Sequence, residues 1–222
     1  MTKARAAIHG VYAITPDEPR TDVLSKQVSD ALAGGVRLFQ YRNKAANRSL
    51  ARVQAVRLRA ITALAGACLI VNDDIDLALE VRADGVHLGR DDLDERVDFS
   101  SIRRRALSAT GVDGRFLIGV SCYNNLELAR KALLAGADYV AFGAFFPSST
   151  KPHSVHAELS LIRQAKEEFA VPVVAIGGIT IKNAPQLVAA GVDSIAVISS
   201  MFGANDICGR AREFTSIFPV ND

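Results

Sequence analysis

Eight short apolar runs alternate along the chain with longer segments in which apolar residues recur every three or four positions. Nearly every run ends in glycine or in a polar, charged or hydroxyl cluster. Runs of this kind are typical of buried strands in a parallel sheet. The predicted strands are Val11–Thr15, Leu38–Tyr41, Cys68–Asn72, Gly85–Leu88, Phe116–Ser121, Tyr139–Phe142, Pro172–Ile176 and Ser194–Ile198.

The segments between these runs have the periodicity of amphipathic helices. Three of them end in closely similar sequences that place a glycine shortly before the next strand, at Gly34, Gly136 and Gly191. Glycine readily adopts the left-handed conformation that closes many helices, so we expect helix ends at these positions. The repeated units predict one domain over residues 1–222. This domain is a single (β/α)8 TIM barrel spanning about 10–218, with its chemistry at the carboxyl ends of the strands.

Composition narrows the partners of such a barrel. The 222 residues include 26 Lys and Arg against 24 Asp and Glu, a formal charge of only +2. This balance favours neither nucleic acid nor an anionic membrane as a partner, although local basic groups suit small phosphorylated ligands. Cys68, Cys122 and Cys208 form no metal-binding or redox spacing. With no signal peptide and no membrane-spanning run, we expect a cytoplasmic protein.

Three polar residues with a spacing of two follow the second predicted strand. In an extended segment the side chains of Gln40, Arg42 and Lys44 would point to the same side. A guanidinium and an ammonium on one wall suit a phosphate or diphosphate. An exposed strand end with solvated charges explains the same pattern equally well.

Acidic residues follow the third and fourth predicted strands. Oxygen ligands from Asp73 and from Asp91 or Asp92 suit Mg²⁺, which usually takes one or two carboxylates and completes its shell with water and phosphate. Helix capping is the alternative, and it is the preferred interpretation for Asp74. The spacing alone does not choose between Asp91 and Asp92.

The remaining strand ends carry hydroxyl groups and glycines. Ser121 closes the fifth strand, and a hydroxyl run ending in Lys151 follows the sixth. Gly177-Gly178 ends the seventh strand and Ser199 follows the eighth, where barrels often bind a phosphate. The two groups of strand ends predict two anion sites, as in a transferase that joins two phosphorylated substrates. For His87, inside a strand, we expect an interior histidine with its hydrogen bonds satisfied.

Taken in order, these segments resemble the thiamine-phosphate synthases. The resemblance rests on Gln40-x-Arg42-x-Lys44, Val71-Asn72-Asp73, Asp84 to Gly89, Gly119-Val120-Ser121, Phe146-Pro147 through Lys151, and Ala175 to Ile179. It implies a (β/α)8 barrel and a Mg²⁺-dependent transferase. That transferase couples 4-amino-2-methyl-5-(diphosphooxymethyl)pyrimidine with a (carboxy)thiazole ethyl phosphate, giving thiamine phosphate and diphosphate by a dissociative displacement.

The resemblance also implies roles for individual residues. Arg42, Lys44 and Lys151 would be catalytic, and Asp73 and Asp92 would hold Mg²⁺. The pyrimidine diphosphate would be bound by Gln40, Tyr41, Arg42, Asn43, Lys44, Asn72, Ser121 and Lys151. The thiazole phosphate would be bound by Ser148, Ser149, Thr150, Gly178, Ile198 and Ser199.

The chain departs from the family pattern at three positions. Arg90 replaces the usual glutamine, Ser148 stands where threonine is common, and Ala144 replaces a frequent proline. Two other functions remain as alternatives: a thiazole tautomerase on the same barrel, and a non-catalytic phosphate-binding or regulatory barrel. The sequence leaves the oligomeric state open, a homo-oligomer included.

Overall fold

The computed structural model describes residues 7–89, 99–110, 116–147 and 157–219. The strands are β1 (Gly10–Ile14), β2 (Leu38–Tyr41), β3 (Cys68–Asn72), β4 (Gly85–Leu88), β5 (Leu117–Tyr123), β6 (Tyr139–Phe142), β7 (Val173–Ile176) and β8 (Ser194–Val197). The helices are α2 (Thr21–Ala33), α3 (Arg48–Leu64), α4 (Ile75–Glu80), α5 (Phe99–Thr110), α6 (Leu126–Leu134), α7 (Leu159–Glu168), α8 (Ala184–Ala189), α9 (Ser199–Phe202) and α10 (Ile207–Thr215).

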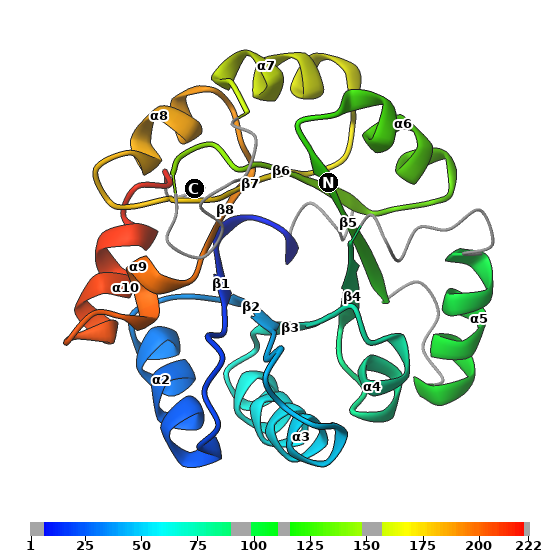
Figure 1. Ribbon diagram of the computed structural model, residues 1–222, viewed down its shortest axis with the longest axis vertical. Coiled ribbons are helices and arrows are strands. Elements are labelled where there is room, and N and C mark those ends of the chain that lie inside the picture. Colours follow the sequence, from blue (N-terminus) through cyan, green and yellow to red (C-terminus); the bar gives the residue numbers. More distant parts are fainter. Residues whose placement is uncertain (1–6, 90–98, 111–115, 148–156, 220–222) are drawn as a thin grey trace.

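The strands form a closed parallel barrel in chain order, and β8 pairs with β1 to complete it. The helices lie around the outside of this barrel (Figure 1). This architecture confirms the predicted (β/α)8 fold. The predicted strands agree with the observed ones to within a residue at most ends, and β5 continues two residues past Ser121 to Tyr123.

Alternating residues of each strand pack on opposite faces of the barrel wall. Val11 and Ala13 belong to the apolar layer between strands and helices, whereas Tyr12 and Ile14 belong to a smaller cluster inside the barrel. The interior also takes the ring of Tyr139, which is fully buried. A Cβ at Gly119 would lie 1.9 Å from Cζ of Tyr139, so only glycine leaves room for that ring.

The helix ends confirm two of the three predicted glycines and correct the third. Gly136 and Gly191 have φ of 99° and 101°, in the left-handed region. In the first unit Gly35 takes this role with φ of 99°, whereas Gly34 has φ of −81°. Gly34 instead allows close packing, because a Cβ there would lie 2.3 Å from Cβ of Ala211 in α10.

Aspartates precede three of the strands at the amino-terminal end of the barrel. The Asp84 carboxylate accepts the backbone N–H of Leu69 in β3 at 2.8 Å and Nη1 of Arg59 in α3 at 2.9 Å. Asp138 and Asp193 repeat this arrangement. Each accepts an N–H of the preceding strand and meets a cation of the helix that comes before that strand, Arg103 of α5 and Lys166 of α7. We call this set of three aspartates the aspartate rim.

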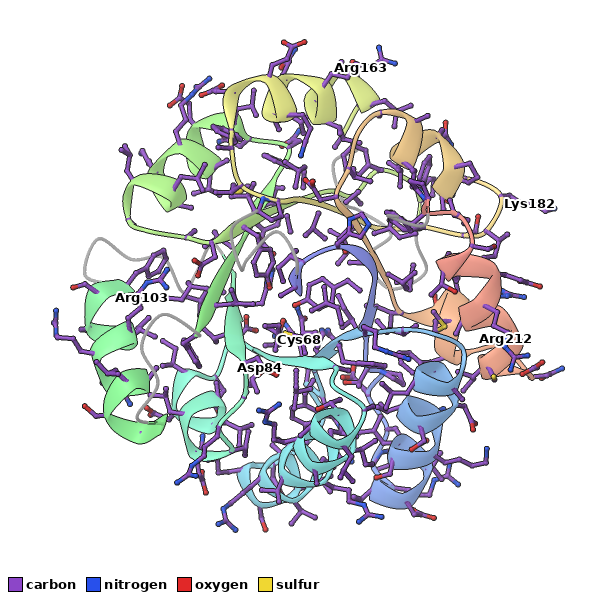
Figure 2. The ribbon with its side chains drawn as sticks, turned by 180° about the vertical axis from the view of Figure 1, so that it is seen from behind. Cys68, Asp84, Arg103, Arg163, Lys182 and Arg212 are labelled. Carbon is purple, nitrogen blue, oxygen red and sulfur yellow. The ribbon has the colours of Figure 1, made fainter. Side chains whose placement is uncertain are left out.

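Figure 2 allows Asp84 of the aspartate rim to be compared with charged residues on the outside of the molecule. Asp84 lies close to Cys68 near the middle of the barrel, where burial raises the pKa of the Cys68 thiol. Arg163, Lys182 and Arg212 instead point outward from the ring of helices. Among the helices that the structure describes, none combines the length and the apolar character needed to cross a membrane.

Candidate active site

Arg42 lies just beyond β2, and the end of β1 fixes its backbone. The hydroxyl of Thr15 accepts the N–H of Arg42 at 2.8 Å and donates to its carbonyl oxygen, also at 2.8 Å. Thr15 is fully buried. The backbone that carries the Arg42 side chain is therefore tied to the barrel wall even though β2 has ended.

Asp17 braces the loop that follows β2. Its Oδ1 accepts the N–H of Lys44 at 2.7 Å and Nη1 of Arg42 at 3.2 Å. Lys44 lies in a turn. The alternation expected for Gln40, Arg42 and Lys44 therefore applies only as far as Arg42, and the position of Lys44 depends on Asp17.

The residues at the intervening positions face the helix layer. The Tyr41 hydroxyl donates to Oε1 of Gln54 in α3 at 3.0 Å, and Nδ2 of Asn43 donates to the same oxygen at 3.0 Å. Asn43 also donates to the carbonyl oxygen of Glu18 at 2.9 Å. The side chains of Tyr41 and Asn43 thus anchor this loop to α3, on the other side of the chain from Gln40.

Asn72 and Asp73 occupy the end of β3. Nδ2 of Asn72 donates to Oδ2 of Asp73 at 2.6 Å, and the N–H of Asp73 donates to the carbonyl oxygen of His87 at 2.8 Å. Asp74 caps α4, because its Oδ1 accepts the N–H of Leu77 at 2.8 Å. This confirms the capping role expected for Asp74 and leaves the Asp73 carboxylate outside the cap.

A cavity of about 310 Å³ opens where β2 and β3 end. It brings the two predicted cations of this side together with the predicted metal ligand and its neighbouring amide. The lining residues are Tyr41, Arg42, Asn43, Lys44, Ala46, Arg48, Ala51, Val71, Asn72, Asp73, Asp74 and Leu77. Positive charge beside a carboxylate suits an anionic ligand that arrives with a divalent cation.

The side chains of Gln40 and Ser121 reach the same hydrogen-bonded chain inside the barrel. Gln40 is buried, and its Nε2 donates to the Tyr12 hydroxyl at 2.9 Å. Ser121 Oγ lies 2.9 Å from Nε2 of His87. His87 is buried, and this burial lowers its pKa to about 4. The expectation of a satisfied interior histidine is confirmed.

Glycines shape the loop after β7. Gly177 and Gly178 have φ of 102° and 62°, and a Cβ at Gly178 would lie 2.3 Å from the carbonyl oxygen of Pro147. The hydroxyl of Ser200 donates to the carbonyl oxygen of Ile179 at 2.6 Å. This bond holds the loop after β7 beside the start of α9, and so brings Gly178 near Ile198 and Ser199.

Several predicted site residues lie outside the described part of the chain. These are Asp92 of the metal pair, Ser148, Ser149 and Thr150 of the thiazole phosphate loop, and Lys151. The Arg90 and Ser148 departures and the alternative ligand Asp91 also lie there.

Four residues of this rim were not predicted from the sequence. Thr15 and Asp17 hold the loop that carries the cations, and Tyr12 connects to Gln40. Asn183 holds the loop after β7, because its Nδ2 donates to the carbonyl oxygen of Gly178 at 3.0 Å. A buried hydroxyl needs a hydrogen-bonding partner, so Tyr12 and Thr15, both in a predicted strand, are the two that a signal could have revealed.

The closed barrel, with cations, a carboxylate and glycine-lined loops on its carboxyl-terminal rim, defines a (β/α)8-barrel enzyme that acts on small phosphorylated molecules. A family model described as thiamine monophosphate synthase matches residues 11–201. The chain belongs to this family, and it is accordingly a transferase that forms thiamine phosphate.

Relatives and solved structures agree with this assignment. The thiamine-phosphate synthase of Nitrosospira multiformis is 48% identical over 214 residues, covering 96% of this chain and 87% of the relative. That of Methylobacillus flagellatus is 48% identical over 211 residues, covering 95% and 96%. The structure of thiamine phosphate pyrophosphorylase from Pyrococcus furiosus is 35% identical, covers 96% of each chain and superposes with a TM-score of 0.78.

Proposed function

We propose that the two substrates bind on two sides of the carboxyl-terminal rim. The aminopyrimidine diphosphate would occupy the side formed by Gln40, Tyr41, Arg42, Asn43, Lys44, Asn72 and Ser121, with Lys151. The thiazole ethyl phosphate would occupy the side formed by Gly178, Ile198 and Ser199, with the 148–150 loop. The observation that carries the proposal is the cavity shared by Arg42, Lys44, Asn72 and Asp73.

The proposed reaction is a displacement at the pyrimidine methylene carbon. The bond from this carbon to the diphosphate oxygen breaks, and diphosphate leaves with the electron pair. The thiazole nitrogen then forms the new carbon–nitrogen bond to the resulting pyrimidine cation. No protein nucleophile is needed, so the protein contributes by holding the reactants and by stabilising charge.

Negative charge grows on the diphosphate as its bond to carbon breaks. Arg42 can give forked hydrogen bonds to phosphate oxygens, whereas Lys44 and Lys151 act as point charges. Thr15 and Asp17 support this role, since they fix the backbone of Arg42 and Lys44 before the substrate binds. Preorganised charges of this kind stabilise a transition state more than a ground state.

Mg²⁺ would be held by Asp73 and Asp92. The described residues contain no group of three or more His, Cys, Asp or Glu side chains suited to a metal ion. The donor set nevertheless fits Mg²⁺, which commonly takes one or two carboxylates together with water and substrate phosphate. The hydrogen bond from Asn72 supports this fit by orienting the Asp73 carboxylate. When bound, Mg²⁺ supplies further positive charge for the diphosphate.

The thiazole phosphate side depends on close approach to the backbone. Gly178 lacks a side chain where a phosphate would have to approach, and Asn183 fixes its carbonyl group. The bond from Ser200 to Ile179 keeps this loop beside Ser199. These contacts support a rigid site on the opposite side of the rim from Asp73.

We also propose that the enzyme acts in the cytoplasm, without nucleic acid or membrane as a partner.

The test is a coupling assay with both purified substrates, in Mg²⁺ and in EDTA. We expect thiamine phosphate only with Mg²⁺, and a loss of activity in Asp73→Asn that added Mg²⁺ partly restores. Asp76→Asn is the matched control, because Asp76 is an exposed carboxylate of α4 that pairs with Arg105.

The same assay separates the alternatives. Equal product in EDTA would overturn the proposed metal site. Isomerisation of the carboxythiazole phosphate alone would favour a tautomerase, and substrate binding without product would favour a regulatory barrel.

A further inference from the structure

Five side chains from five strands form an unbroken chain of hydrogen bonds across the barrel interior. Nε2 of Gln40 donates to the Tyr12 hydroxyl at 2.9 Å, and this hydroxyl lies 2.9 Å from that of Tyr139. The Tyr139 hydroxyl lies 3.1 Å from Nδ1 of His87, and Nε2 of His87 lies 2.9 Å from Oγ of Ser121. We call this set the interior relay.

The two ends of the interior relay are both residues assigned to the pyrimidine diphosphate. Gln40 is in β2 and Ser121 is in β5, so the relay joins separate parts of the same proposed binding site. Its three middle members, Tyr12, Tyr139 and His87, are buried and have no place in the reaction described above. Their arrangement needs a reason of its own.

The rings of the middle members are held in place by packing. Tyr139 stacks on His87 with ring centroids 5.6 Å apart, and it meets Tyr12 edge to face at 6.2 Å. The gap left by Gly119 receives the Tyr139 ring. Rings held in this way cannot turn to find other partners, so the protons of their polar groups must be shared within the relay.

Counting protons gives the relay a direction. The amide nitrogen of Gln40 only donates, so the Tyr12 oxygen accepts from it. The partner that remains in the relay for the Tyr12 hydroxyl proton is the Tyr139 oxygen, and giving that proton an acceptor makes Tyr12 the donor of this bond. Tyr139 then donates a hydrogen bond to Nδ1 of His87. Because Nδ1 accepts this hydrogen bond, the N–H of the His87 ring lies on Nε2, the nitrogen that faces Ser121. That proton is donated to Ser121.

We propose that Tyr12, Tyr139 and His87 are positioning residues that set the hydrogen-bonding polarity of the pyrimidine site. At one end of the relay, Oγ of Ser121 accepts a hydrogen bond from Nε2 of His87, so the Ser121 hydroxyl can donate its own hydrogen bond to the substrate. At the other end, the amide nitrogen of Gln40 is already bonded to Tyr12, which leaves the side-chain carbonyl oxygen of Gln40 to accept a hydrogen bond from an amino group of the substrate. The inference rests on the proposed substrate side. The ligand class it selects is an amino-heterocycle linked to an anion.

The first test is the tautomer of His87 in the intact protein. The protein would be labelled with ¹⁵N-histidine and studied by nitrogen NMR. The ring signals of His87 are identified as those that disappear in the His87→Gln variant. We expect the proton on Nε2. A proton on Nδ1 would overturn the proposal, because Nε2 would then accept from Ser121, and the Ser121 hydroxyl proton would no longer be available to a substrate. This measurement needs no substrate and no activity.

The second test compares Michaelis constants in the coupling assay. Tyr139→Phe removes the central hydroxyl and keeps the ring, and we expect the KM for the pyrimidine diphosphate to rise about tenfold. The KM for the thiazole phosphate should stay within twofold. His87→Gln should recover part of the loss seen in His87→Leu, because its amide can still donate to Ser121. If Tyr139→Phe does not fold, Tyr12→Phe tests the Gln40 end in the same way.

Two comparisons make the outcome decisive. Ser194→Ala removes a buried hydroxyl of β8 outside the relay and should leave both KM values unchanged. If Ser121→Ala raises the pyrimidine KM and Tyr139→Phe lowers only the melting temperature, the relay is merely structural and the proposal fails. If the wild-type protein forms no thiamine phosphate, the proposed substrate side fails instead, and the tautomer result still judges the direction of the relay.

Discussion

The two ends of the barrel use the same kinds of charged residue differently. At the amino-terminal end each aspartate of the aspartate rim accepts a strand N–H and meets a helix cation. At the carboxyl-terminal end Arg42, Lys44 and Asp73 border a cavity of about 310 Å³. At the first end the carboxylates bind the backbone of the strands and the cations of the helices, whereas at the second end the charged side chains also line a cavity that a ligand could enter. Stability and chemistry are thus separated along the barrel axis.

The largest effect is expected from Arg42 at the carboxyl-terminal end. Arg42→Ala should lower kcat by about 10²–10³, because its charge acts on the departing diphosphate. The free energy of unfolding should change by less than about 1 kcal/mol, because the partner Asp17 is 43% exposed and such ion pairs contribute little. Lys151→Ala should have a similar effect on kcat. Steady-state kinetics and denaturant unfolding measure the two quantities.

Arg52→Ala provides the control for this prediction. Arg52 is an exposed residue of α3 that pairs with Glu80, and its loss should leave kcat within twofold of wild type. An Arg42→Ala protein that keeps its kcat but loses stability would remove the distinction between the two ends.

The opposite result is expected at the aspartate rim. Asp138→Ala leaves the buried N–H of Ile118 without the carboxylate that accepts it at 2.7 Å. An unsatisfied buried group of this kind should lower the free energy of unfolding by about 1–3 kcal/mol. Turnover per folded molecule should stay within twofold, as measured below the melting temperature. Asp138→Asn keeps an acceptor oxygen and should lose less stability, and an equal loss would show that the ion pair with Arg103 dominates.

The fold was predictable because the same pattern of apolar strand, amphipathic helix and glycine repeats along the sequence. Eight apolar runs gave strands close to the observed ones, and Gly136 and Gly191 closed their helices as expected. The prediction for Gly34 was wrong because two glycines lie next to each other there. Only the number of residues between each glycine and the start of β2 distinguishes them. Gly35 precedes Leu38 by three residues, as Gly136 precedes Tyr139, so the left-handed role falls to Gly35.

The site was predictable where neighbouring residues decide it and not where distant ones do. Alternation in an extended segment predicts one direction for Gln40, Arg42 and Lys44, but Lys44 lies in a turn whose backbone bonds to Asp17, which precedes it by 27 positions. Tyr12 and Tyr139 lie 127 positions apart in the sequence and meet only when the barrel closes. Contacts across a closed barrel leave no local pattern in the sequence.

The smallest expected effect compares two glycines with nearly equal backbone angles. Gly178 at the end of β7 has φ of 62°, and Gly66 before β3 has φ of 63°. Alanine is strained in this conformation, so the backbone strain alone should cost each Gly→Ala variant about 1 kcal/mol of stability. A Cβ at Gly66 meets no atom within 4 Å, whereas one at Gly178 would lie 2.3 Å from the Pro147 carbonyl oxygen. Only Gly178→Ala should therefore displace the thiazole phosphate loop and raise the KM for that substrate, by roughly tenfold if one backbone hydrogen bond to the phosphate is lost. Equal kinetics in the two variants would mean that the loop after β7 contributes to the fold alone, and that the carboxyl-terminal end is functional only on its β2–β3 side.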